Sequence, residues 1–184
     1  NADGSRTLKM FDTDKYFQRP GSKDWTAIDS SLVDDKRPGW LRNAANSWSV
    51  AFGPVQGNGN GGVELDTGYG VMQFAPRNAK SNVAPERVVG QPNAVIYRDV
   101  WPNVDLRYTV TGSSVKEEIV VRGATTASAF EFSQGGTLKP AATPEGGVVV
   151  SNAADGSSRS WGIGQTIVKN NAGKRVEKPA KAAT

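Results

Sequence analysis

The sequence predicts an all-β fold, an antiparallel β-sandwich with many short strands and little or no helix. Three observations lead to this prediction. Apolar and polar residues alternate over short segments, as in half-buried strands. Glycine and proline together number 31 (21 + 10) of 184 residues, and turn sequences separate the segments at regular intervals. We find no stretch with a helical apolar period long enough to form a helix.

The most regular element is a β-hairpin formed by residues 106–110 and 115–121. Alternation in both segments puts apolar side chains on one face, and a four-residue polar link joins them. In the register set by that link, the opposite pairs are Val110 with Val115, Leu106 with Ile119, and Arg107 with Glu118. Apolar and opposite-charge pairs of this kind each contribute roughly 0.2–1 kcal/mol.

Further strands are expected along the rest of the chain. In order, they lie at 7–11, 25–29, 47–52, 69–75, 129–133, 147–151 and 161–168, with an apolar run from Ala94 leading into the hairpin. The stretch 53–62 holds five glycines and two asparagines. Because no phosphate-loop spacing or helix follows it, we expect a flexible hairpin loop rather than a phosphate site.

Composition excludes several classes of site. The chain has no cysteine and no histidine, so thiol nucleophiles, Ser-His-Asp triads and His- or Cys-ligated zinc are impossible. Five basic residues and one acidic residue follow position 168, so the tail accounts for the whole net charge of +4. We therefore expect a frayed end at 1–6, one domain at 7–168, and a basic linker or tail at 169–184, with no nucleic-acid partner and no membrane insertion.

Two groups of residues resemble a known family. The first is Trp25, Ile28, Asp29 and Leu32, in the spacing W-x-x-I-D-x-x-L. The second is Tyr97, Asp99, Val100, Pro102, Val104, Asp105, Leu106 and Tyr108, followed by a strand that contains Lys116 and Glu117. This order resembles the β-rich N-terminal module of large secreted or wall-associated bacterial proteins of the YD/RHS-repeat type. The resemblance implies export and a modular role, and it implies no catalytic residue.

The resemblance is incomplete in two respects. The glycine that usually follows the proline is Asn103 here, which also accepts a left-handed conformation. No YD repeats and no toxin domain follow in this sequence, so the activities of such parts do not transfer to it.

Three acids are candidates for chemistry. Glu117 falls on the inner face beside Tyr108, where a structural carboxylate or a general acid of raised pKa is expected. Asp99 and Asp105 are its possible partners in a glycosidase or lyase. Asp105 is alternatively expected to cap the Pro-Asn corner. No metal site and no cofactor is expected.

The five tryptophans are the other candidates. Trp25 and Trp48 lie in strand patterns and are expected in the core. Trp40, Trp101 and Trp161 lie beside glycine or proline, where they stack on a sugar, anchor a partner or join a satellite core. We expect a non-enzymatic structural or interaction module of an exported bacterial surface or toxin-delivery protein, bound to neighbouring domains or a wall glycan. The alternatives are a carbohydrate-binding module and, more weakly, a carboxylate-based glycosidase or lyase.

Overall fold

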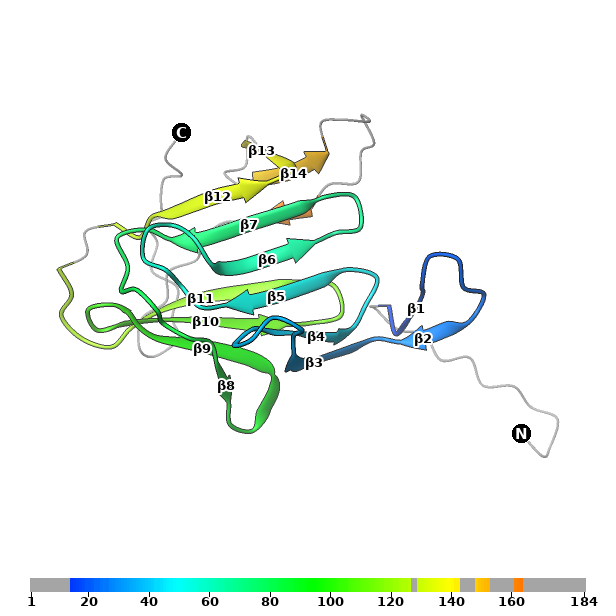
Figure 1. Cartoon of the computed structure of the whole chain (residues 1–184), viewed down its shortest axis with the longest axis horizontal. Coiled ribbons are helices and arrows are strands. Elements are labelled where there is room, and N and C mark those ends of the chain that lie inside the picture. Colours follow the sequence, from blue (N-terminus) through cyan, green and yellow to red (C-terminus); the bar gives the residue numbers. More distant parts are fainter. Residues whose placement is uncertain (1–13, 127–128, 143–147, 153–160, 164–184) are drawn as a thin grey trace, which may run out of the picture. The chain divides into compact units, whose positions relative to one another are not determined.

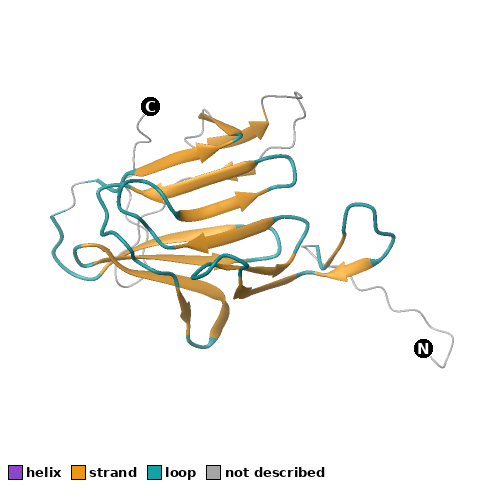
Figure 2. Ribbon diagram, viewed as in Figure 1, coloured by secondary structure: helices purple, strands orange, loops and turns teal. Residues whose placement is uncertain are grey.

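The computed structural model describes residues 14–126, 129–142, 148–152 and 161–163. Over these residues the chain forms β-strands and no helix (Figure 2), which confirms the predicted fold class. The strands are β1 (Tyr16–Gln18), β2 (Trp25–Ala27), β3 (Asp29–Asp34), β4 (Leu41–Ala45), β5 (Ser49–Gly53), β6 (Gly62–Asp66), β7 (Val71–Pro76), β8 (Glu86–Val88), β9 (Gln91–Trp101), β10 (Val104–Val110), β11 (Val115–Val121), β12 (Phe132–Gly136), β13 (Leu138–Ala142), β14 (Val148–Asn152) and β15 (Trp161–Ile163).

The chain divides into two compact units, Asn1–Gly135 and Gly136–Thr184. In the second unit, β13, β14 and β15 form a three-stranded antiparallel sheet. The strand predicted at 7–11 and the ends at 1–6 and 169–184 lie outside the described residues. The predicted limits of the main domain therefore stay a prediction.

The first unit contains three sheets (Figure 1). The largest has six strands in the order β12-β7-β6-β5-β4-β3, and a second has the order β11-β10-β9-β8. The first two strands form a separate ribbon, β1-β2. The pairings within this ribbon, from β8 to β11 and from β3 to β7 are all antiparallel. Most neighbours in a sheet are also neighbours in sequence, so short turns are sufficient to connect them.

Aromatic side chains from the two larger sheets form the core between them. The ring of Tyr108 on β10 lies 5.5 Å from the ring of Phe52 on β5 and 6.2 Å from that of Phe74 on β7. The Tyr97 ring packs edge-on against Tyr108 at 6.0 Å. Its hydroxyl donates to the carbonyl of Gly53 at 3.1 Å, which satisfies a buried polar group and ties the two sheets together.

The predicted hairpin register is confirmed. Val110 pairs with Val115, Leu106 with Ile119, and Arg107 with Glu118. Leu106 and Tyr108 are buried, whereas Ile119 is half-buried. Ile119 is less buried than Leu106 and Tyr108 because it lies on β11, an edge strand with a neighbour on one side only.

Several strands were not expected from the sequence, among them β1, β4, β6, β8 and most of β3. In β4 the apolar alternation is interrupted by Asn43, which is buried. Its amide donates to the carbonyl of Trp48 and its side-chain oxygen accepts the N–H of Val50. The side chain thus replaces ladder hydrogen bonds between β4 and β5, and a polar residue occupies an inward position.

The glycine-rich stretch is tied down at several points, unlike the flexible loop expected. Val55 forms a β-bridge with Val83. The Ser81 hydroxyl donates to the carbonyl of Gln56 at 2.9 Å, and the Ser133 hydroxyl donates to the carbonyl of Gly59. Glycines are needed here because four of them, Gly57, Gly59, Gly61 and Gly62, have positive φ.

Candidate functional site

The second family-like motif forms the corner between β9 and β10. Pro102 and Asn103 make the turn, and Asn103 takes the expected left-handed conformation, with φ of 61°. Just before the turn, β9 bulges: Val104 pairs with Trp101, but Leu106 pairs with Tyr97. The extra residues of β9 include Asp99, whose φ is also positive, at 51°. A bulge of this kind needs partners for the backbone groups that leave the ladder.

Asp105 supplies that partner. Its side chain is almost fully buried, and Oδ1 accepts the backbone N–H of Asp99 at 2.8 Å. Its other oxygen, Oδ2, lies 3.0 Å from Nε of Arg122, and the same guanidinium also donates to the Asp99 carboxylate. The expected capping role is thus realised across the bulge rather than within the Pro-Asn turn.

Sequence reasoning did not identify Arg122. It follows β11 directly, and its N–H donates to the carbonyl of Asn103 at 2.8 Å. The signal was available in principle, because extending the predicted hairpin register beyond Val104 and Val121 places Arg122 opposite Asn103. One guanidinium therefore neutralises both acids of the motif.

Glu117 pairs with Tyr108 across the hairpin, as predicted. The Tyr108 hydroxyl donates to Glu117 Oε2 at 2.6 Å. Although Glu117 as a whole is exposed, its carboxylate turns inward to this buried hydroxyl. Desolvation there raises the pKa of Glu117, and the hydroxyl partly opposes the rise. Burial and the nearby carboxylate raise the pKa of Tyr108 well above its ordinary value, so the phenol stays protonated.

The three candidate acids do not share one cleft. Asp105 and Tyr108 are three residues apart on one regular strand, so their side chains point to opposite faces of the sheet. Glu117 lies on the Tyr108 side, and Asp105 lies on the other side with Arg122. Among the residues described, no cluster of three or more acids is suited to holding a metal ion.

The raised pKa predicts how stability depends on pH at Glu117. The pKa of Glu117 is higher in the folded state than in the unfolded state, so the protonated carboxyl group favours folding. This stabilisation is fully present below the ordinary pKa of 4.5 and is lost as the pH rises through the folded-state pKa. We expect Glu117→Gln to gain stability relative to the wild type as the pH rises above the ordinary carboxyl pKa of 4.5. The gain should be small because Glu117 is an exposed residue, where solvent screens the interaction.

Urea unfolding at several pH values measures this effect. Glu118→Gln is the matched control, because its carboxylate lies on the other face and pairs with Lys116 at 2.6 Å. A wild-type protein whose stability rises with pH relative to Glu117→Gln would contradict the assignment.

The remaining motif residues have structural contacts. Asp29 Oδ1 accepts the N–H of Ser31 at 2.9 Å, at the point where the register of β3 shifts against β4. The Ser31 hydrogen bonds lower the pKa of Asp29. Tyr97 is buried in the core, Pro102 starts the β9–β10 turn, and Lys116 pairs with Glu118 on the surface.

The tryptophans are distributed differently from the prediction. Trp48 is buried in the core, as expected. Trp25, expected in the core, is 67% exposed, because it lies on the ribbon β1-β2 and not in a sandwich sheet. Trp101 is 4% exposed, so it offers no open ring face. The side chain of Trp161, on β15, lies outside the described residues.

Trp40 packs flat on the outer face of the six-stranded sheet. A Cβ at Gly53 would lie 2.1 Å from its indole, so only glycine leaves room for the ring. The Arg37 guanidinium covers the other ring face at 3.8 Å and bonds to Asp35 and Glu64 at 3.0 and 3.1 Å. The indole is therefore covered on both faces, so of the three roles considered for Trp40 the geometry favours a packed contact over a stacking platform for a sugar.

Gly53→Ala tests this packing. The methyl group would expel the Trp40 ring, and overpacking of this kind costs about 1–3 kcal/mol. We expect red-shifted tryptophan emission and a lower urea midpoint. Gly112→Ala is the control, since its Cβ would meet its nearest neighbour at an ordinary 3.5 Å. If Gly53→Ala and Gly112→Ala changed the emission and the urea midpoint equally, the packing of Trp40 on Gly53 would be contradicted.

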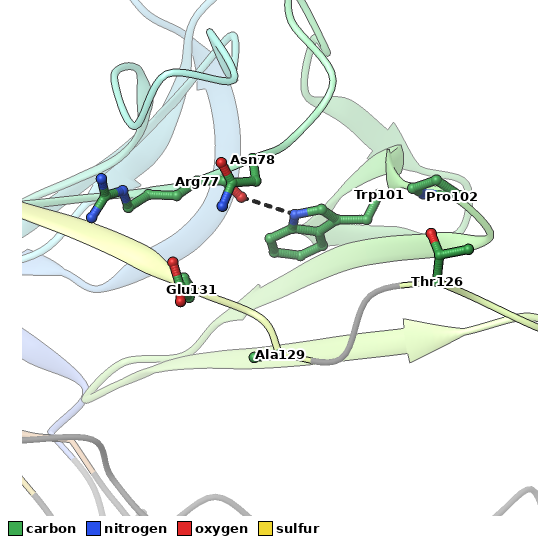
Figure 3. Close-up of a pocket in the computed structure, with 7 residues that line it drawn as sticks. All are labelled: Arg77, Asn78, Trp101, Pro102, Thr126, Ala129 and Glu131. Atoms are coloured by element: carbon green, nitrogen blue, oxygen red, sulfur yellow. Dashed lines mark hydrogen bonds between the residues drawn. The ribbon is translucent and has the colours of Figure 1, made fainter.

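A hollow of about 270 Å³ lies beside the buried Trp101 (Figure 3). It is lined by Arg77, Asn78, Trp101, Pro102, Thr126, Ala129 and Glu131. The indole N–H donates to the carbonyl of Arg77 at 3.0 Å, and the ring packs on Phe130 and Phe132. Glu131 is the single acid of this lining, so the described part of the hollow lacks the carboxylate pair of a glycosidase.

Comparison of the chain with protein-family models, with curated proteins and with solved structures found no match. In the described part of the chain, no helix has the length and apolar character needed to cross a membrane. The geometry of the described residues and the sequence motifs are thus the basis for a functional proposal.

Proposed function

We propose that this chain is a non-catalytic structural and interaction module of a larger exported bacterial surface protein. One observation carries the proposal: the acids suited to chemistry have structural partners. Asp99 and Asp105 share Arg122 at a strand bulge, and Glu117 bonds to Tyr108. The resemblance of the two motifs to modules of secreted and wall-associated proteins supports export.

A carbohydrate-binding role is the second candidate. It is favoured by the exposed aromatic side chains of the ribbon β1-β2, whereas Trp40 and Trp101 do not favour it, because both rings are covered. The glycosidase or lyase alternative has less support, because Glu117 and Asp105 lie on opposite faces of their sheet.

Two measurements test the proposal. The complete reading frame that includes this chain should encode an export signal and further domains; a frame that encodes this chain alone, without such a signal, would overturn the proposal.

The second measurement is of catalytic turnover. Incubation of the chain with polysaccharides and peptidoglycan should release no reducing ends or unsaturated products. Turnover that Glu117→Gln or Asp105→Asn abolishes would also overturn it.

A further inference from the structure

The ribbon β1-β2 has one face that the fold does not use. Tyr16 pairs with Ala27, and Gln18 pairs with Trp25, so these four side chains share a face. All four are exposed, with Trp25 at 67% and Tyr16 at 57%. Phe17 points to the opposite face and is buried. We call the exposed set, Tyr16, Gln18, Trp25 and Ala27, the ribbon face.

The ribbon is anchored at its base, which leaves this face free. The β1-β2 ladder continues by one further pair, because the N–H of Ile28 donates to the carbonyl of Lys15 at 2.9 Å. Gly112, in the β10–β11 turn, lies against Asp14 and Ile28, and its carbonyl also accepts from Asn46 at 2.8 Å. In Figure 1 the ribbon projects beyond the ends of the sandwich strands, next to the start of β3.

Neither ring of the ribbon face has an aromatic or cationic stacking partner among the described residues. A two-stranded ribbon needs one packed face for stability, which Phe17 provides. Tyr16 and Trp25 therefore contribute little to folding as they stand. Adjacent exposed aromatic side chains of this kind mark contact sites for a ligand or partner.

The size and charge of the ribbon face identify the type of ligand. A stable protein interface takes about 20–30 residues on each side, many more than the four of this face. Residues 14–27 carry three basic and two acidic side chains, a net charge of +1 (3 − 2), which is far from the basic surface of a nucleic-acid site. The face itself carries no charge.

We propose that the ribbon face binds neutral glycans by stacking pyranose rings on Trp25 and Tyr16. The apolar C–H face of a sugar matches the electron-rich face of an aromatic ring. Gln18 lies beside them, and its amide donates to the carbonyl of Lys23 at 3.0 Å, which orients its oxygen to accept from a sugar hydroxyl. This inference rests on the proposed interaction role and names its ligand class.

The test uses the whole chain. Isothermal titration with cellohexaose, chitohexaose, xylohexaose and mannohexaose should detect binding of at least one of them, with little dependence on salt. Trp25→Ala and Tyr16→Ala should each weaken that binding at least about tenfold, or 1.4 kcal/mol, whereas Trp25→Tyr should largely preserve it. Val89→Ala is the control, because Val89 is 98% exposed on the β8–β9 turn, away from the ribbon.

The inference is overturned if none of the four oligosaccharides binds, or if binding survives both alanine substitutions. It is also overturned if Val89→Ala weakens binding as much as Trp25→Ala. Binding that disappears in moderate salt would identify an electrostatic ligand instead and would equally overturn it. The proposed module role fails separately, through the reading frame or through turnover.

Discussion

Replacing Gly61 by alanine is expected to destabilise the protein by about 3 kcal/mol or more. Gly61 has φ of 74°, a conformation that costs other L-residues about 1–2 kcal/mol. In addition, a Cβ at this position would lie 1.9 Å from the carbonyl oxygen of Pro54, which is backbone and cannot rotate away. The β5–β6 connection would have to change its path.

Gly90→Ala separates the cost of the positive φ from the cost of the steric clash. Gly90 has φ of 75°, but a Cβ there would meet nothing within 4 Å. It should therefore cost only the backbone term of about 1–2 kcal/mol. Urea unfolding of both variants measures the difference. Equal losses would mean that the approach of Gly61 to Pro54 is incorrect.

Asp105→Asn is expected to cost about 2 kcal/mol. The substitution keeps the shape of the side chain but removes the charge that binds the Asp99 N–H and the Arg122 guanidinium. The carboxylate is 3% exposed, whereas the Arg122 side chain is 44% exposed. Water can therefore hydrate the Arg122 guanidinium once its carboxylate partner is removed. The loss of stability is for this reason smaller than for a fully buried ion pair.

Glu86→Gln is the matched control for Asp105. It also removes a carboxylate paired with an arginine, since Glu86 lies 3.0 Å from Arg98, but both side chains are more than half exposed. Surface pairs of this kind contribute at most about 1 kcal/mol. Chemical denaturation should give a clearly lower free energy of unfolding for Asp105→Asn than for Glu86→Gln. The reverse order would refute the structural role of Asp105.

Much of the central hairpin could be predicted from the sequence. The alternation from Leu106 and the short polar link set its register, because a slip of one residue would turn the apolar face to water. The pairing of Glu117 with Tyr108 followed directly from that register. Local patterns were sufficient here because both strands are adjacent in sequence.

Other features depended on contacts that are distant in sequence. Strand β4 has a buried Asn43 at an inward position, so apolar alternation alone could not identify it. Gly53 and Trp40 contact each other only after β4 and β5 have folded back. Trp25 has a strand-like pattern but pairs in a ribbon of two strands, and no local signal distinguishes this ribbon from a core sheet.

In the described part of the molecule, the residues that stabilise the fold and the residues proposed to bind a ligand lie in different places. The motif acids Asp99 and Asp105 and their partner Arg122 hold a bulge at the end of the four-stranded sheet. The ribbon face lies apart from that corner, and its aromatic side chains are exposed. We therefore expect substitutions at the corner to change stability and substitutions on the ribbon face to change binding.

The free energy of unfolding of Trp25→Ala, measured beside that of Asp105→Asn, tests this separation most directly. An exposed side chain without core contacts should lie within about 0.5 kcal/mol of the wild type when truncated, whereas Asp105→Asn should be about 2 kcal/mol less stable. A loss of about 3 kcal/mol or more for Trp25→Ala, as for a buried tryptophan, would contradict the account.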